Sequence, residues 1–341
     1  MRPETENYVR RKSSWGPIEG YRSLLRYCGE TVDVVRDLAA VPGIHAVTIG
    51  AYDGVHAGHR KIISATQQAA KSHGAKTAVV TFEPHPSFVL RPDKAPKLLT
   101  SLDLKLELLA GIGVDTVMVL PFNHARAAET ADQFVTQVLV DSLHAKAVVV
   151  GDDFQFGRNR QGNLDLLAKL GVLNGFEVSG LPVMGPDQTV KDVSSTAIRA
   201  AVASGDVRAA ARMLERCHRL RGTVVKGDQR GRTIGFPTAN VDVGPEMALP
   251  GDGVYAAWFI DTDGTRRPAA VNIGKRPTFY ADADRSLIEA HLIGFKGDLY
   301  GQLVDVEFVE RIRDERAFGG IDELTAQLNQ DVESARTVLE H

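Results

Sequence analysis

The feature that most constrains the fold of this chain is an alternation, from residue 45 to residue 150, of short β-branched runs with longer amphipathic segments. The runs predict strands at 46–49, 77–82, 116–120 and 146–150, and the segments between them predict helices at 61–72, 102–112 and 131–143. The spacing suits right-handed β-α-β crossovers, so this half is predicted to be a doubly wound α/β domain with a parallel sheet. Helices at 196–203 and 207–216 are expected to close it.

The pattern changes after Arg219, where glycine-rich turns separate short strand candidates without intervening helix signals. Strands are predicted at 222–225, 254–260, 269–273, 287–293 and 303–309, followed by one helix over 321–339. This order predicts a small antiparallel β-barrel with a terminal helix packed on it. A length of 341 residues, at roughly 150 per domain, agrees with two domains, and we place their boundary near residue 217.

Composition excludes several classes of protein. With 43% hydrophobic and 24% charged residues the chain is of ordinary globular composition. Forty Lys and Arg against 43 Asp and Glu give a net charge of -3, which argues against nucleic acid or an anionic membrane as partner and favours small-molecule substrates. Two cysteines without paired spacing and the lack of any apolar run of roughly 20 residues favour a cytoplasmic protein. Nothing in the sequence indicates an oligomeric state.

The most informative segment is GAYDGVHAGH at residues 50–59, where the first predicted strand passes to the first helix. The first turn of a helix has unpaired N–H groups and a partial positive charge, and Gly58 lets a polyphosphate approach the backbone. His56 and His59 could then donate hydrogen bonds to phosphate oxygens during nucleotidyl transfer. Two alternatives are ordinary surface histidines around a turn, and a zinc site formed by His56, His59 and His85.

Three further segments of the first half join this motif. They are FEPHP at 82–86, GDDFQFG at 151–157 and VSSTAIR at 193–199. Together with residues 50–59 they resemble the bifunctional bacterial riboflavin kinase/FMN adenylyltransferase (FAD synthetase) family. Glu83 stands where that family has Asp, and Tyr52 where Phe is usual.

Residues 1–40 are interpreted as an N-terminal extension, whose order the sequence does not indicate. The resemblance implies a Rossmann-like nucleotidyltransferase domain over 41–217 and a riboflavin kinase domain over 218–341. It also implies site residues for the first of these domains. The ATP site would comprise His56, Gly58, His59, Asp153, Ser195, Thr196 and Arg199, with Asp153 on the nucleoside. The flavin would contact Phe82, Pro84, His85 and Pro86. A planar guanidinium such as Arg199 suits phosphate oxygens because it grips them in pairs and stays charged.

In the second half, GFPTAN at 235–240 matches the signature of the family's kinase domain. In an extended segment Thr238 and Asn240 point the same way, so a hydroxyl and an amide oxygen could meet one hard cation; an isolated Thr-x-Asn could equally stabilise a turn. By resemblance the cation is Mg²⁺ and Glu289, on the polar face of its predicted strand, is the base. Phe318, Leu324 and Asp331 are expected to help enclose the flavin.

The predicted activities follow in two steps. The barrel phosphorylates riboflavin with ATP to give FMN, and the N-terminal domain adenylylates FMN with a second ATP to give FAD and pyrophosphate. One alternative is an adenylyltransferase for another phosphate ester with a non-catalytic flavin-binding barrel. Another is a nucleic-acid-binding barrel, which would need a clustered basic and aromatic surface.

Overall fold

The computed structural model describes residues 22–27, 30–182, 193–227, 231, 234–275 and 286–340. The chain divides into two compact units. The first takes residues up to 52, 58–95 and 102–191, and the second takes 53–57, 96–101 and 192–341. Two short segments of the first half therefore belong to the second unit, and each unit is described separately below.

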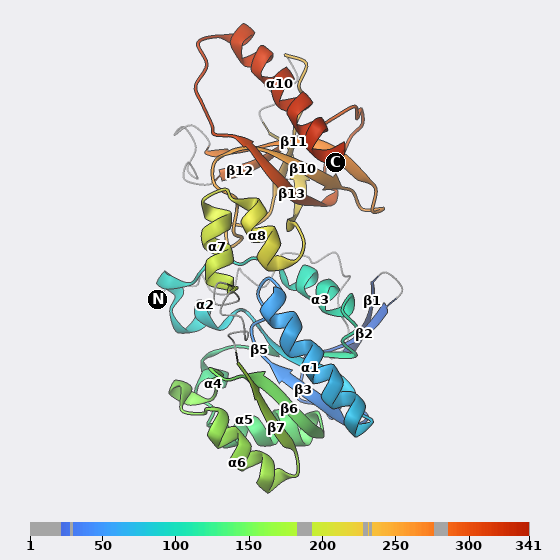
Figure 1. Ribbon diagram of the computed structural model, residues 1–341, viewed down its shortest axis with the longest axis vertical. Coiled ribbons are helices and arrows are strands. Elements are labelled where there is room, and N and C mark those ends of the chain that lie inside the picture. Colours follow the sequence, from blue (N-terminus) through green and yellow to red (C-terminus); the bar gives the residue numbers. More distant parts are fainter. Residues whose placement is uncertain are drawn as a thin grey trace. The chain divides into compact units, whose positions relative to one another are not determined.

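A seven-stranded sheet forms the centre of the first unit (Figure 1). Its strands are β1 (Arg22–Tyr27), β2 (Glu30–Val35), β3 (His45–Ile49), β4 (Lys76–Glu83), β5 (Thr116–Pro121), β6 (Ala145–Gly151) and β7 (Glu177–Leu181), in the spatial order β1-β2-β5-β4-β3-β6-β7. Only the β1–β2 pair is antiparallel among the strands of this sheet. The predicted parallel α/β sheet is confirmed.

Helices cover both faces of this sheet. The helices between the strands of this unit are α1 (Ala57–His73), α2 (Pro86–Leu90), α3 (Leu102–Ala110), α4 (His124–Ala127), α5 (Ala131–Phe134), the π-helical η3 (Val135–Ser142) and α6 (Leu164–Asn174), with 3-10 turns η2 (Pro92–Lys94) and η4 (Arg158–Arg160). Side chains of α5, η3 and α6 pack on one face, against Val47 and Val148, while Ala70 of α1 packs on the other, against Ala46 and Ala147. Burial on both faces explains why β3 to β6 are nearly continuous apolar runs.

Residues 22–27 and 30–35 lie within the segment interpreted as an N-terminal extension, whose order the sequence does not indicate. They form the hairpin β1–β2, and β2 pairs with β5 so that it lengthens the sheet. Val32 and Val34 of β2 are buried. Part of the segment assigned to an extension is therefore sheet, while residues 1–21 lie outside the described residues.

The second unit contains a closed barrel of six antiparallel strands preceded by two helices. Its elements are α7 (Ser195–Ala203), α8 (Val207–Leu214), β8 (His218–Val225), β9 (Ala239–Asp242), β10 (Gly253–Ile260), β11 (Arg266–Lys275), β12 (Ser286–Leu292), β13 (Leu303–Arg313) and α10 (Ile321–Glu340). The strand order is β10-β11-β12-β9-β8-β13, and β13 pairs with β10 to close the barrel. Helix α10 packs on β10, β11 and β13 (Figure 1), which confirms the predicted barrel with a terminal helix. Strand β9 was not predicted.

A buried histidine at the start of the barrel makes its stability depend on pH. His218 is 1% exposed, its Nε2 lies 2.9 Å from the Ala248 carbonyl oxygen, and its ring stacks on Phe308. Burial lowers the pKa of His218 to about 4, against 6.5 for an ordinary histidine. In the unfolded chain the histidine binds a proton between these values while in the folded chain it does not.

We therefore expect the barrel's free energy of unfolding to fall by roughly 3 kcal/mol as the pH drops from about 6.5 to about 4, with full stability above pH 6.5. Urea unfolding followed by the fluorescence of Trp258, in a Trp15→Phe background, measures it. His218→Gln removes the titrating group and should flatten the pH dependence; an unchanged slope in that variant would show that other groups cause it.

Candidate active sites

The loop between β3 and α1 has an unusual backbone. Tyr52 and Val55 have φ angles of 49° and 42°, and Gly54 has 88°. A positive φ is strained for a β-branched residue, and Val55 is also fully buried. Such a conformation persists only where surrounding contacts determine it, and it is found most often at functional sites.

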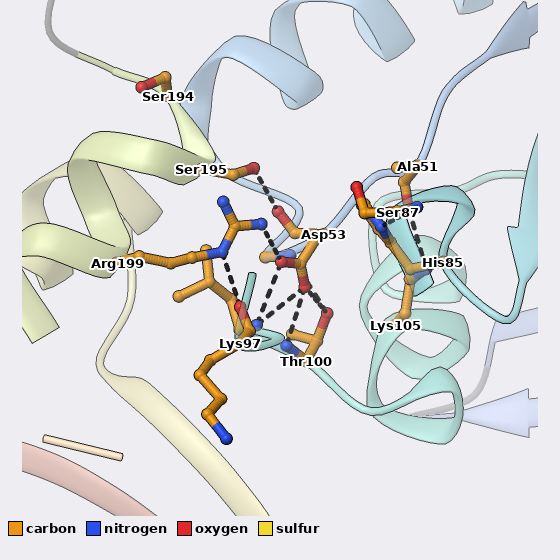
Figure 2. Close-up of polar contacts among 12 residues, drawn as sticks. Ala51, Asp53, His85, Ser87, Lys97, Thr100, Lys105, Ser194, Ser195 and Arg199 are labelled. Atoms are coloured by element: carbon orange, nitrogen blue, oxygen red, sulfur yellow. Dashed lines mark hydrogen bonds and ion pairs between the residues drawn. The ribbon is translucent and has the colours of Figure 1, made fainter. Parts of the chain in front are cut away.

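Contacts from two distant segments hold this loop within the second unit (Figure 2). The Asp53 carboxylate accepts hydrogen bonds from the backbone N–H groups of Leu99 (2.9 Å) and Thr100 (3.1 Å) and forms an ion pair with Arg199 (2.7 Å). The Ser195 hydroxyl donates to the Asp53 carbonyl oxygen at 2.9 Å. Ser195 and Arg199, which the sequence analysis names as site residues, both contact Asp53. Asp53 is not among the site residues expected from the sequence.

His56 follows in the same loop and is 6% exposed. Burial lowers the pKa of His56 to about 4; the nearby Asp53 carboxylate opposes this shift, and Arg216 and Arg199 add to it. The ring is therefore neutral near pH 7 and carries one N–H donor. An arriving phosphate would favour the protonated ring, because an opposite charge raises the pKa of a histidine.

Gly58 and His59 lie in the first turn of α1, directly after that helix begins at Ala57. The His59 ring packs on Tyr52, with ring centroids 4.9 Å apart, and the Tyr52 hydroxyl lies 2.6 Å from Thr48 Oγ1. Burial raises the pKa of Tyr52. The predicted positions at the positive end of a helix are confirmed. Among the described residues there is no group of three His, Cys, Asp or Glu side chains able to hold a metal ion, so the zinc alternative finds no support.

The remaining predicted residues of the α/β half lie at the carboxyl ends of neighbouring strands. Phe82 is near the end of β4 and packs edge to face on Phe122, with 5.6 Å between ring centroids. The His85 side chain caps α2 by accepting from Ser87 N at 3.2 Å; Pro84 follows a cis peptide bond, and Pro86 begins the helix.

Asp153 is exposed in the loop after β6, beside the stacked rings of Phe154 and Phe156. Because β3 pairs in parallel with both β4 and β6, these loops share one sheet edge, where chain order changes direction and ligands of α/β folds bind.

Helix α7 carries the last predicted phosphate-binding residues. Its N-cap is Ser194, whose hydroxyl accepts from Ala197 N at 3.1 Å. Ser195, Thr196 and Arg199 lie in its first turns, and Thr196 is exposed. The Arg199 side chain is directed by a second contact, from its Nε to the Lys97 carbonyl oxygen at 2.7 Å.

In the barrel, Asn240 of β9 is the register partner of Glu289 on β12. Asn240 is 7% exposed, and Thr238 lies two residues before it, directly ahead of β9. A Cβ at Gly227 would lie 2.3 Å from Asn240 Nδ2, so a larger residue there would force the Asn240 amide to shift. Ile288 and Ala290 are buried whereas Glu289 is half-buried, which confirms the predicted alternation along β12.

The predicted flavin-enclosing residues of the barrel lie around Arg313 and α10. Asp331 is 2% exposed and pairs through both oxygens with the Arg313 guanidinium, at 2.8 and 2.7 Å. The Phe318 ring lies 5.7 Å from the same guanidinium, and Leu324 is half-buried in the first turn of α10. The structure therefore brings Phe318 and Asp331 to one arginine, which sequence reasoning missed.

Both halves of the chain are similar to known proteins. A family model described as FAD synthetase matches residues 40–197, and one described as riboflavin kinase matches residues 214–339. The bifunctional riboflavin kinase/FMN adenylyltransferase of Escherichia coli strain K12 is 39% identical over 290 residues, covering 85% of this chain and 91% of the relative. The chain belongs to the bifunctional riboflavin kinase/FMN adenylyltransferase family.

Other members of the bifunctional riboflavin kinase/FMN adenylyltransferase family are similarly related. The protein from Bacillus subtilis strain 168 is 37% identical over 296 residues, covering 85% of this chain and 90% of its own. A solved structure described as a macrolide-efflux protein from Streptococcus pneumoniae has a TM-score of 0.79 and 30% identity, covering 89% of this chain and 98% of that one. No helix in the described part of the present chain is long and apolar enough to cross a membrane.

As a riboflavin kinase/FMN adenylyltransferase, the protein is an enzyme of FAD biosynthesis. It phosphorylates riboflavin to FMN and adenylylates FMN to FAD. Because the riboflavin kinase model matches the barrel, the alternative of a non-catalytic flavin-binding barrel is not supported.

Proposed function

We propose that the first half binds the phosphates of ATP where the β3–α1 loop meets the opening turn of α1, using His56, Gly58 and His59. The observation that carries this proposal is the position of the His-x-Gly-His motif after a central parallel strand and at a helix N-terminus. An FMN phosphate oxygen attacks the α-phosphorus, the bond from that phosphorus to the bridging oxygen breaks, and pyrophosphate leaves with its electron pair. Fixed donors stabilise the charge that develops on the phosphates.

Further groups are proposed to act in the adenylyltransferase reaction. Ser195, Thr196 and Arg199 add donors for phosphate oxygens, and Asp153 contacts the nucleoside. The loop with Phe82, Pro84, His85 and Pro86 receives the flavin. Support comes from their place on loops that follow β4 and β6, and from the first turns of α7.

In the barrel we propose that Glu289 accepts the proton of the ribityl 5′-hydroxyl as its oxygen attacks the γ-phosphorus of ATP. The register pairing of Glu289 with Asn240 supports a shared site. The bond between the γ-phosphorus and the bridging oxygen breaks, ADP leaves and FMN forms. Holding the hydroxyl in line with the γ-phosphorus supplies much of the rate enhancement.

Thr238 and Asn240 fit Mg²⁺ that arrives with ATP. Both offer oxygen atoms, the ligand type that Mg²⁺ takes in proteins, and Gly227 lets the Asn240 amide lie where a Cβ would clash with it. This ion usually keeps water and substrate phosphates as its other ligands, so two protein oxygens suffice. When bound, it would neutralise negative charge on the transferred phosphoryl group.

Phe318 and Leu324 are proposed to cover the flavin, while Asp331 acts by fixing α10 to Arg313. Asp331→Asn should lower the free energy of unfolding of the barrel by about 2–3 kcal/mol, because it leaves the Arg313 cation, which is 19% exposed, without its partner. Urea unfolding followed by Trp258 fluorescence measures it. Glu333→Gln removes an exposed carboxylate of the same helix and should cost less than about 1 kcal/mol. A large rise in the KM for riboflavin with unchanged stability would instead favour direct flavin contact.

Incubation with riboflavin, ATP and Mg²⁺, with chromatographic separation of the flavins over time, tests the proposal as a whole. FMN should appear first and FAD later. His56→Ala should prevent the formation of FAD while FMN is still made. A His56→Ala protein that makes FAD at the normal rate would exclude the proposed phosphate site.

We propose a cytoplasmic location and small molecules as the only substrates. The balanced charge of -3 and two cysteines without paired spacing support this.

A further inference from the structure

Asp53 is the most completely engaged carboxylate around the β3–α1 loop. It is 2% exposed, and both of its oxygens accept hydrogen bonds: Oδ1 from Leu99 N and Thr100 N, and Oδ2 from Leu99 N (3.2 Å) and the Arg199 guanidinium. All these groups belong to the second unit. A buried carboxylate with this many donors is held in one orientation and joins the chain segments that supply those donors.

The neighbouring backbone of the loop is fixed as well. Gly54 N donates to Thr100 Oγ1 at 3.1 Å, and Arg216 donates to the Gly54 carbonyl oxygen at 2.7 Å. These contacts surround Val55, whose φ of 42° costs of order 1–3 kcal/mol and needs such support. His56 is the next residue, so the contacts of Asp53 and Gly54 fix the backbone that leads into it.

The same carboxylate determines the direction of Arg199. The contacts to Asp53 and to the Lys97 carbonyl oxygen use two of the five N–H donors of the guanidinium (Figure 2). The Arg199 side chain is 18% exposed, and within the described part of the chain its other donors have no partner, so they could reach an oxygen of ATP. Asp53 therefore connects a loop residue and a helix residue that are both proposed to act on the phosphates.

We propose that Asp53 is a positioning residue of the adenylyltransferase reaction, which holds the His56 loop and the Arg199 guanidinium in one fixed arrangement. The proposal rests on the proposed roles of His56 and Arg199. It predicts that weakening the carboxylate disturbs the geometry of the phosphate site without touching the kinase chemistry, because a displacement of about 1 Å can cost on the order of 100-fold in rate.

Asp53→Asn in the full chain tests this. Asparagine has the same shape as aspartate but no negative charge. Its NH₂ group would face N–H donors that now contact a carboxylate oxygen. We expect kcat/KM for FMN adenylylation to fall about 10–100-fold, with a raised KM for ATP, while the riboflavin kinase rate of the same molecules stays within about twofold. Asp206→Ala serves as a matched control: it removes the N-cap of α8, where the carboxylate accepts from Ala209 N, and should leave both rates unchanged below the melting temperature.

A double-variant cycle with Arg199→Ala separates positioning from simple destabilisation. If Asp53 acts through Arg199, adding Asp53→Asn to Arg199→Ala should reduce kcat/KM much less than it does in the wild type. Fully additive effects, or an Asp53→Asn protein with normal FAD synthesis, would overturn the proposal.

Two further measurements keep the test decisive. If Asp53→Asn does not fold, Thr100→Val removes the hydroxyl that accepts from Gly54 N and donates to Asp53 Oδ1 at 3.4 Å. It should lower the adenylylation rate about 3–10-fold with normal kinase activity, and normal rates of both reactions would contradict positioning. His56→Ala is assayed in parallel. Normal FAD synthesis in His56→Ala would refute the proposed function, whereas loss there with normal synthesis in Asp53→Asn refutes only the role of Asp53.

Discussion

FMN should accumulate and FAD should not form when the His59→Ala protein is given riboflavin, ATP and Mg²⁺. His59 lies in the first turn of α1, and its loss removes a donor from the proposed phosphate site. Removing one fixed donor of this kind lowers kcat by about 10²–10³-fold. Chromatography of the flavins measures both reactions in one sample, since the barrel continues to make FMN.

His144→Ala is the control for this variant because His144 is an exposed histidine of the same unit. It should leave both rates unchanged. A folded His59→Ala protein that lost both activities, or that made FAD at the normal rate, would contradict the assignment of the first half to adenylylation through His59.

The opposite result is expected for Glu289→Gln. The variant should lose riboflavin phosphorylation by about 10²–10⁴-fold, because glutamine cannot accept the hydroxyl proton, yet it should still convert added FMN to FAD. The side chain keeps its size on β12 opposite Asn240, so the barrel should remain folded. Initial rates with riboflavin and, separately, with FMN measure the two effects.

Glu310→Gln provides the matched control. Glu310 lies on β13 and pairs with the exposed Arg208, so its loss should change neither rate by more than about twofold. Normal phosphorylation by Glu289→Gln would exclude Glu289 as the base, and loss of FMN adenylylation in that variant would contradict the separation of the two sites.

Much of the fold could be predicted because burial leaves a strong sequence pattern. Strands β3 to β6 are covered on both faces and read as apolar runs, and Ile288, Ala290 and Leu292 alternate with polar residues on β12. The hairpin β1–β2 lies at the edge of the sheet, where Leu24 is 69% exposed, so its apolar pattern is weak. Strand β9 has four residues, too few for a periodic signal.

The adenylyltransferase site residues could be predicted only where the groups that act together are close to one another in the sequence. The histidines and Gly58 share one helix start, and Ser194 caps α7 from the adjacent position. Asp53 is different because its partners Leu99 and Arg199 are 46 and 146 residues away. No period or spacing in the sequence connects such groups; only the fold brings them together. The sequence indicates Asp53 only through its position within residues 50–59, the segment that contains the histidine motif.

The two reactions are expected to take place at chemically separate sites in one chain. Mixing two variants that each lack one of the reactions tests this most directly. His59→Ala and Glu289→Gln proteins are combined in equal amounts with riboflavin, ATP and Mg²⁺, and FAD is followed by chromatography. FMN released by the first variant should be converted by the second, so the mixture makes FAD although neither protein does alone. If the mixture of the two folded variants accumulated FMN without FAD, or made neither flavin, the two reactions would not have separate sites that work independently.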